Sequence, residues 1–255
     1  MLKKRIIPTL LLRDNRMVKG KNFNSYVDVG DPISCIKIYN AQYADELIFI
    51  DINKDRFLSD ELFKILKTAS KNCFIPLTAG GGINSIKKIS KLLLSGADKV
   101  ILNSINFKNP KLMYLAAKKF GSQCIVVGVD IKKIEGQYFI FSDLGIKQER
   151  KKIKEYITEC TENGAGEFFI NSIDNDGLME GYDINLINEI SRHTSLPIIS
   201  SGGAGNFNHV ELLFKKTKST GAACGSIFYF ADNNPIRLST YLTQNKITQK
   251  KIKYQ

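Results

Sequence analysis

Short apolar runs alternate with amphipathic stretches along most of the chain. In the amphipathic stretches apolar residues recur every three or four positions, which predicts helices at 60–71, 83–96 and 183–193. The apolar runs are nearly continuous, as is typical of parallel strands that are buried on both faces. Strands are predicted in this way at 5–11, 47–52, 74–79, 99–103, 124–130, 167–172, 196–200 and 221–225.

The alternation of strands and helices predicts a parallel sheet with helical crossovers, in the α/β class. The chain also repeats itself at an offset of roughly 120 residues. IPLTAGGGI at 75–83 matches LPIISSGGAG at 196–205, and ADELIFIDI at 44–52 resembles GAGEFFINSI at 164–173. Two (βα)4 halves, about 1–120 and 121–245, would produce this repeat by closing into one barrel. We therefore predict a single (βα)8 TIM-barrel domain over residues 1–255.

Two segments are longer than simple connections. Residues 14–31, after the first strand, are polar and contain glycine, which favours a mobile loop over the active face. Residues 131–146, after the fifth strand, contain EGQYFIF and are expected to form a small hairpin.

Composition excludes several classes of protein. Of 255 residues, 43% are hydrophobic and 24% charged, which suits a globular chain rather than a disordered one. The five cysteines are widely spaced and form no CxxC motif, so we expect reduced thiols in a cytoplasmic protein. The first apolar run is too short for a signal peptide, and no run is long enough to span a membrane. We expect no membrane partner.

The net charge of +12 raises the question of an anionic ligand. The basic residues are scattered, and no zinc finger or other nucleic-acid motif accompanies them, so no nucleic-acid partner is predicted. The charge fits a lysine-rich surface or, as the alternative, a groove for a multiply charged anion.

Two glycine-rich turns follow the third and seventh predicted strands, at 80–82 and 202–205. Each precedes a helix, so its backbone N–H groups and the helix dipole could hold a phosphate. Their equivalent positions in the two halves, with Asn103-Ser104 and Gly225-Ser226 at the next strand ends, predict a ligand with a phosphate at each end. Two purely structural turns are the alternative.

Three carboxylates stand at or just beyond strand ends: Asp51, Asp130 and Asp176. Asp130 directly ends an apolar run and is the best candidate for a general acid or base; a carboxylate that caps a loop is the alternative. Its counterpart in the first half is Leu11, which can transfer no proton. No His, Cys or Asp cluster has metal-ligand spacing, so neither a metal nor a cofactor is predicted.

Four charged residues begin strands at the opposite end of the predicted barrel: Arg5, Glu46, Lys99 and Glu167. Their signs alternate around the barrel bottom. They could form a salt-bridged plug beneath the core or a gate into the barrel axis, and the sequence leaves both possibilities open.

Several stretches together resemble the cyclase subunit of imidazole glycerol phosphate synthase, a histidine-biosynthesis enzyme, over nearly the whole chain. The resemblance implies a TIM barrel that binds a phosphorylated small molecule, an aminoimidazole precursor with two phosphoribosyl arms. It also implies a glutaminase partner, which docks at the barrel bottom as the second subunit of a heterodimer and sends ammonia up the barrel. The stretches that carry the resemblance are VKGKNF (18–23), GDPI (30–33), GGGI (80–83), GADKV (96–100), SIDNDG (172–177), GYD (181–183) and SGGAG (201–205).

Carried over by position, the resemblance assigns roles to individual residues. Asp130 matches one of two catalytic aspartates, and Lys19 matches a loop residue that closes over the substrate phosphate. Asp98 is expected at the partner interface, and Thr78 and Ser201 near the channel exit. The ammonia gate would consist of Arg5, Glu46, Lys99 and Glu167. The phosphate-binding positions would be Gly82, Asn103, Gly177, Gly203 and Ser226.

The chain departs from the family pattern on one side of the active face. The second catalytic aspartate is expected at position 11, where this chain has leucine, and strand 1 reads PTLLLRD where the family is closer to ACLDVKD. Leu178 and Asn171 each stand where threonine is usual. Loss of a catalytic acid or base removes a factor of about 10²–10⁴ in rate.

That combination resembles a side branch of the family in which the barrel and a glutaminase-like partner supply ammonia to a separate amidotransferase. That enzyme makes an acetamidino group on a bacterial surface sugar, as in lipopolysaccharide. An ammonia-conducting barrel of this kind is our main interpretation. The alternative is a true cyclase of histidine biosynthesis, in which Asp14 or Asp51 would have to replace position 11. A regulatory or nucleic-acid-binding barrel is supported only by the charge.

Overall fold

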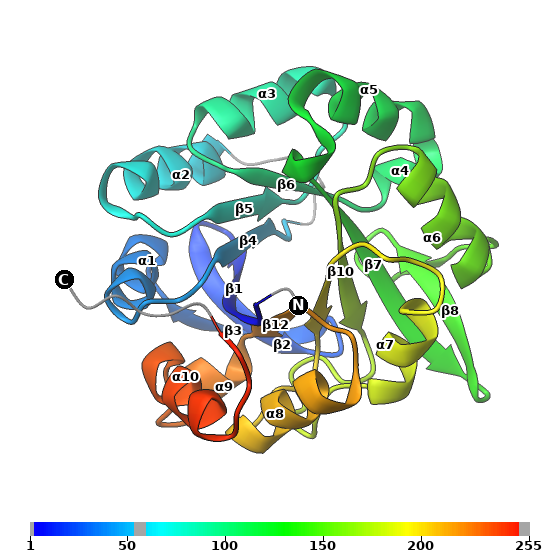
Figure 1. Ribbon diagram of the computed structural model, residues 1–255. Coiled ribbons are helices and arrows are strands. Elements are labelled where there is room, and N and C mark those ends of the chain that lie inside the picture. Colours follow the sequence, from blue (N-terminus) through cyan, green and yellow to red (C-terminus); the bar gives the residue numbers. More distant parts are fainter. Residues whose placement is uncertain (1–2, 54–59, 250–255) are drawn as a thin grey trace.

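In a computed structural model, which describes residues 3–53 and 60–249, the chain forms a closed parallel barrel surrounded by helices (Figure 1). Among the described residues, eight strands pair in parallel around the barrel, and β12 closes it against β1. This confirms the predicted (βα)8 architecture. The barrel strands are β1 (Arg5–Arg13), β4 (Leu47–Asp51), β5 (Leu77–Gly80), β6 (Lys99–Leu102), β7 (Ile125–Ile134), β10 (Glu167–Ser172), β11 (Ile198–Ser201) and β12 (Gly221–Cys224).

Helices follow the strands and pack around the outside of the barrel. Apolar residues on one face of each long helix meet the outward-facing apolar residues of the strands, which makes the main core. The helices are α1 (Pro32–Ala41), α2 (Asp60–Asn72), α3 (Ile86–Leu94), α4 (Ile105–Lys108), α5 (Pro110–Phe120), η1 (Ser122–Cys124, a 3₁₀ turn), α6 (Ile153–Glu162), α7 (Ile184–Ile190), α8 (Phe207–Lys216), α9 (Ser226–Tyr229) and α10 (Pro235–Gln244).

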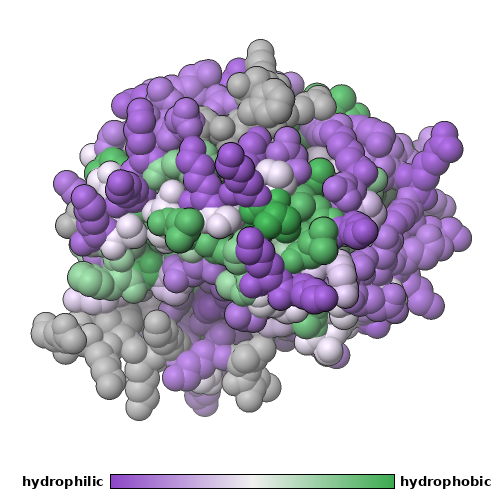
Figure 2. Space-filling view, turned by 90° about the horizontal axis from the view of Figure 1, so that it is seen from above, coloured by the Kyte–Doolittle hydropathy of each residue, from purple (hydrophilic) through white to green (hydrophobic). Residues whose placement is uncertain are grey.

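The outer surface is mainly hydrophilic where α3 and α5 face solvent (Figure 2). An apolar patch interrupts it, and Leu94 and Leu115 are exposed apolar residues on these two helices. None of the described helices is long and apolar enough to cross a membrane.

The barrel interior is built in layers, because every second residue of a strand points inward. Along β1 the inward positions are Arg5, Ile7, Thr9 and Leu11, from the bottom of the barrel to the top. The second layer is apolar throughout and forms its own buried cluster. Its members are Ile7, Ile48, Ile101, Val126, Phe169, Ile199 and Ala223. Charged residues therefore lie below this layer, and the strand tops lie above it.

The segment after strand 1 forms regular secondary structure where the sequence predicts a loop. Instead of a mobile loop, residues 14–31 form the antiparallel hairpin β2 (Arg16–Lys21) and β3 (Asn24–Gly30), and β2 pairs with the end of β1. The reason is that the apolar pattern continues past the barrel: Met17 and Val18 are buried against β1. The hairpin lies over the barrel mouth, since its turn packs on the loop after β10.

The second predicted insertion does form a hairpin. β7 continues beyond the barrel and turns at Glu135 and Gly136, both with positive φ, into β8 (Gln137–Ser142). Two positive φ angles are what a tight two-residue hairpin turn requires. A short strand, β9 (Lys147–Gln148), extends this ribbon. Element ends otherwise agree with the predictions to within three residues, and Cys124 lies in a 3₁₀ turn rather than in a strand.

Candidate functional site

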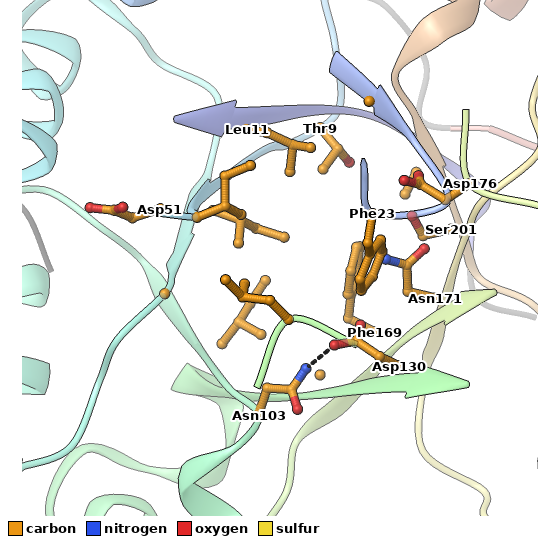
Figure 3. Close-up of a pocket in the computed structure, with 18 of the residues that line it drawn as sticks. Thr9, Leu11, Phe23, Asp51, Asn103, Asp130, Phe169, Asn171, Asp176 and Ser201 are labelled. Atoms are coloured by element: carbon orange, nitrogen blue, oxygen red, sulfur yellow. Dashed lines mark hydrogen bonds between the residues drawn. The ribbon is translucent and has the colours of Figure 1, made fainter. Parts of the chain in front are cut away.

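A cavity of about 470 Å³ opens at the carboxyl ends of the barrel strands (Figure 3). All the phosphate-binding positions predicted from the sequence line it, together with Lys19, Leu11, Asp130 and Ser201. Parallel barrels place strand ends and the loops that follow them at one face, and for this reason residues far apart in the sequence meet here. The structure brings this group together as expected; the role of each residue stays a prediction.

The two glycine-rich turns face each other across the cavity mouth. Gly82 and Gly203 have positive φ angles of 54° and 105°, which favour glycine. A Cβ at Gly203 would lie 1.9 Å from the carbonyl oxygen of Gly181, and one at Gly177 would lie 2.0 Å from that of Gly20. Close backbone contacts therefore require glycine at Gly177 and Gly203 with or without a ligand. The turns that contain Gly82 and Gly203 lead into α3 and α8, so the N-terminal ends of both helices lie at the same end of the barrel as the cavity, where their dipoles favour an anion.

Asp130 lines the cavity from β7 and is only 8% exposed. Its Oδ2 accepts a hydrogen bond from Asn103 Nδ2 at 2.7 Å. Burial raises the pKa of Asp130 to about 7, although hydrogen bonds from Asn103 and Asn171 oppose the shift. Its hydrogen-bond partners are neutral amides, and the nearby Asp176 adds to the rise in pKa, so this carboxyl exchanges its proton near neutral pH. That is the property a general acid or base needs.

Leu11 faces the cavity from β1, opposite Asp130 (Figure 3). Asp14, one of the suggested substitutes, does not line the cavity, and its side chain is 82% exposed beside Arg13. Asp51 does line it, but its Oδ1 accepts from both the backbone N–H and the side-chain amide of Asn53, at 3.0 and 2.7 Å. In Figure 3 its carboxyl points away from Asp130. Neither residue takes the place of a carboxylate at position 11.

Lys19 reaches from the hairpin into the barrel mouth. It is 6% exposed, and its Nζ donates to the carbonyl oxygen of Thr9 at 2.5 Å and lies 5.6 Å from the ring centroid of Tyr229. Burial lowers the pKa of Lys19 to about 8, against the opposing effect of Asp176. The hairpin turn is tied down by Asn22, whose side chain donates to the carbonyl oxygens of Ile173 and Asp174.

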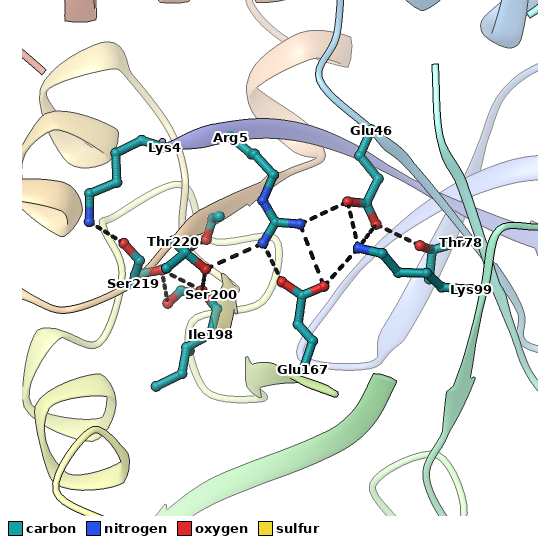
Figure 4. A network of polar contacts seen from close by, with 11 residues as sticks. Lys4, Arg5, Glu46, Thr78, Lys99, Glu167, Ile198, Ser200, Ser219 and Thr220 are labelled. Atoms are coloured by element: carbon teal, nitrogen blue, oxygen red, sulfur yellow. Dashed lines mark hydrogen bonds and ion pairs between the residues drawn. The ribbon is translucent and has the colours of Figure 1, made fainter. Parts of the chain in front are cut away.

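The four charged residues at the other end of the barrel form one closed ring (Figure 4). Arg5 Nη1 lies 2.9 Å from Glu46 Oε2, and Lys99 Nζ lies 3.1 Å from the same oxygen. Glu167 pairs with both cations, at 2.9 Å from Lys99 Nζ. The ring carries two positive and two negative charges, so its net charge is zero.

Burial and charge act against each other in this ring. Burial would raise the pKa of Glu167, but Arg5 and Lys99 outweigh it and hold that pKa below its usual range. Burial likewise works against the charged forms of Arg5 and Lys99, yet the two glutamates raise the pKa of both cations. Arg5, Lys99 and Glu167 therefore stay ionised around neutral pH.

Two further predicted residues lie at this lower end. Thr78 is buried in β5 and donates to Glu46 Oε1 at 2.5 Å, so the structure places it beside the ring and not near the upper exit. Ser201, its companion in the prediction, lines the cavity above. Asp98 is exposed at the barrel bottom, where its Oδ2 accepts from the backbone N–H of Leu77 at 2.8 Å.

Sequence reasoning missed Thr220, which stands next to the ring just before β12. Its Oγ1 accepts a hydrogen bond from Arg5 Nη2 at 3.3 Å. It also missed Phe23, which lines the cavity, and Tyr229, whose ring lies beside the Lys19 ammonium. A threonine before a strand is by itself no signal. Thr220 could have been found only by asking which residues begin the strand that neighbours β1 and so lie beside Arg5.

A family model described as histidine biosynthesis protein matches residues 5–234. The chain belongs to this family. It is 44% identical over 247 residues to imidazole glycerol phosphate synthase subunit HisF of Campylobacter concisus, with 96% of each chain covered. It is 39% identical over 247 residues to the subunit of the same name from Natranaerobius thermophilus, and this alignment covers 97% of the present chain and 98% of the relative. With the Streptococcus sanguinis subunit it shares 41% identity over 231 residues, 90% and 92% of the two chains.

These relatives confirm the resemblance to the cyclase subunit over most of the chain. They do not show the narrower side branch of sugar modification. Their names fit the alternative, a cyclase subunit of histidine biosynthesis, better than they fit our main interpretation.

Proposed function

We propose that the protein is the ammonia-accepting barrel subunit of a two-subunit glutamine amidotransferase. The observation that carries the proposal is the alignment of three layers on one axis: the charged ring, the apolar layer and the cavity. A glutaminase docked at the barrel bottom, near Asp98, would release ammonia at the ring. The order of the layers then sets the direction of transfer.

The apolar layer selects the form of ammonia that passes. Neutral ammonia loses little on entering an apolar passage, whereas burying an unpaired ammonium ion is strongly unfavourable. Ammonium would have to leave its proton at or below the ring. The ring also closes the lower end when its ion pairs are formed, which keeps water and bulk ions from the interior.

In the cavity, the two glycine-rich turns are proposed to hold a phosphorylated small molecule. Lys19 would add a positive charge from above, once it leaves the carbonyl oxygen of Thr9. Asp130, poised near neutral pH, would supply or remove one proton next to the ligand. Ammonia would emerge beside Ser201, between this carboxyl and the phosphate sites.

Two candidate functions differ in the molecule that accepts the ammonia. Leu11 favours a barrel that delivers ammonia and leaves the two-aspartate cyclisation undone, because the cavity holds Asp130 without an acid or base opposite it. The acceptor we expect is a bacterial surface sugar that a separate amidotransferase converts to its acetamidino form. The names of the relatives favour the second candidate, the cyclase of imidazole glycerol phosphate synthase.

An ammonium-driven cyclase assay separates the two. Purified protein is given the bisphosphate aminoimidazole substrate and ammonium salt at high pH, which makes the glutaminase unnecessary. A barrel that only conducts ammonia shows no turnover under conditions in which a related HisF subunit is active. Leu11→Asp is the matched gain-of-function variant; it should bring turnover, which the double variant with Asp130→Asn then loses.

Turnover by the wild type within about 10²-fold of the related subunit, lost on Asp130→Asn, would establish the cyclase and overturn the conduit. For the conduit, the positive test follows the amide nitrogen. With ¹⁵N-glutamine, a glutaminase and the sugar amidotransferase, label should enter the acetamidino group only when this barrel is present.

A further inference from the structure

The Arg5 guanidinium is bound from outside the ring as well as within it. Its Nη1 donates to Glu46, and its Nη2 donates to Glu167 and, at 3.3 Å, to Thr220 Oγ1. The Thr220 hydroxyl in turn donates to the carbonyl oxygen of Ile198 at 3.1 Å (Figure 4). A hydroxyl whose proton is committed to a carbonyl presents a lone pair, and this orientation suits a cationic donor.

Thr220 is itself held firmly. Its backbone N–H donates to Ile198 O at 2.8 Å, the same oxygen that its hydroxyl uses, and its carbonyl oxygen accepts from the backbone N–H of Arg5 at 3.0 Å. The preceding residue, Ser219, is fully buried and lies 2.9 Å from Ser200, Oγ to Oγ. The acceptor offered to Arg5 is thus fixed by β11 and β12 and does not depend on a mobile side chain.

The next residue leaves room for the guanidinium. A Cβ at Gly221 would lie 3.5 Å from Arg5 Nη2 and 2.9 Å from Ile7 Cδ1. Any side chain there would crowd the interior just beneath the apolar layer. Thr220 thus supplies a hydrogen-bond acceptor for Arg5, and Gly221 leaves space beside the guanidinium. The Arg5 side chain can therefore extend across the lower opening of the barrel.

The other ring members are held differently. Glu46 is also tied to a hydroxyl, that of Thr78, but the recorded hydrogen bonds of Lys99 Nζ and of the Glu167 carboxylate join them only to ring residues. Among the described residues, therefore, two of the four members have an anchor outside the ring, and Thr220 is the anchor of Arg5.

We infer that Thr220 is a positioning residue for the lower gate: its hydroxyl holds the Arg5 guanidinium across the barrel entrance and so controls the passage of ammonia. The first half of this statement concerns the isolated chain. The second half rests on the proposed function, since only an ammonia-conducting barrel has passage to control.

Two substitutions test the inference as a matched pair. Thr220→Val keeps the shape and the branched Cβ but removes the acceptor, so Nη2 faces a methyl group. Thr220→Ser keeps the acceptor. Because a hydrogen bond to a charged group is a strong one, the loss should be measurable even though both cation–carboxylate pairs of Arg5 remain.

The direct readout is NMR of the arginine side chains in the isolated protein. A guanidinium held on both Nη atoms rotates slowly and gives separate Nη signals. In Thr220→Val the Arg5 Nη signals should exchange roughly threefold or more faster, while Thr220→Ser keeps the wild-type rate; Arg5→Lys identifies the signals. Equal rates in Thr220→Val and wild type would overturn the positioning role.

The second readout is coupling to a glutaminase. It compares the nitrogen incorporated into product per glutamine hydrolysed with the rate of product formation when ammonium salt replaces glutamine. Thr220→Val should lower incorporation per glutamine about two- to fivefold and leave the ammonium-driven rate unchanged. A purely structural role would lower both rates together, and that outcome, like unchanged coupling despite faster Arg5 exchange, would overturn control of passage. A wild type that incorporates no glutamine nitrogen would instead refute the proposed function, and the NMR result would still stand.

Discussion

The Asp130 carboxyl should lower the free energy of unfolding as the pH rises, and replacing Asp130 should remove this pH-dependent decrease. The carboxyl has a pKa of about 7 in the folded chain because burial disfavours its charged form, against an ordinary value of 3.8. Between these values the folded state binds a proton that the unfolded state has released. Stability therefore falls as pH rises through this window, which is the opposite of the usual behaviour of a salt-bridged carboxylate.

The size of the effect follows from the shift. One pKa unit corresponds to about 1.4 kcal/mol, so a shift of roughly three units costs ~4 kcal/mol once the pH is above 7, of which ~2–3 kcal/mol accrues between pH 5 and pH 8. Asp130→Asn cannot ionise and keeps a similar shape beside Asn103. The variant should gain stability relative to wild type by about the latter amount on going from pH 5 to pH 8.

Urea denaturation of both proteins at pH 5 and pH 8 measures this difference. Asp14→Asn is the control for removal of a carboxylate, since the Asp14 side chain is 82% exposed and lies outside the cavity. A direct titration of the Asp130 carboxyl carbon by NMR should place its midpoint near 7. If Asp130→Asn gains nothing at pH 8, or the midpoint lies near 4, the carboxyl is solvated and our account of a proton-exchanging Asp130 is wrong.

Two further variants test the ring and the glycine-rich turns. Glu167→Gln should lower the free energy of unfolding by about 2–4 kcal/mol at pH 7, because it removes the buried carboxylate that pairs with two half-buried cations. Since the pKa of Glu167 is depressed in the folded chain, the penalty should shrink below pH 4.5. Equal penalties at pH 3.5 and pH 7 would contradict the ion-pair account. Gly203→Ala should destabilise the protein by more than about 2 kcal/mol beyond Gly136→Ala, since both have positive φ but only Gly203 meets backbone, as urea midpoints would show. Similar losses in the two would mean that the turn at 202–205 can shift.

The barrel could be predicted because its signal is repeated along the chain. Each strand reads as a continuous apolar run and each helix as an amphipathic one, and the glycine-rich turns recur at matching places in the two halves. Strand order then follows from right-handed crossovers. The grouping of Asp130, Gly82, Gly203 and Ser226 around one cavity needed only the rule that strand ends share a face.

What the sequence did not reveal depends on contacts between distant segments. In the mostly polar segment that forms the β2–β3 hairpin, Met17 and Val18 continue the apolar pattern, and their burial against β1 depends on contacts that the sequence does not show. Lys19 was expected over a phosphate, yet in this structure its ammonium is turned inward onto the carbonyl oxygen of Thr9. Thr220 and Thr78 hold ring residues across the sheet, and no spacing along the chain records such a contact.

The titratable groups at the two ends of the barrel behave differently near neutral pH, and this difference matters for the effect of Leu11. At the ring the ion pairs favour the charged forms of Arg5, Lys99 and Glu167, so these groups hold charge in place without exchanging protons near neutral pH. At the cavity Asp130 exchanges a proton near pH 7 but has an apolar residue opposite it. Asp176 also lines the cavity, and burial raises its pKa, but the two-aspartate cyclisation that the family resemblance implies places its second carboxylate at position 11. The cavity therefore lacks the carboxylate that the two-aspartate pattern expects at position 11, and Leu11→Asp is the smallest change that would test whether the cavity otherwise suits cyclisation.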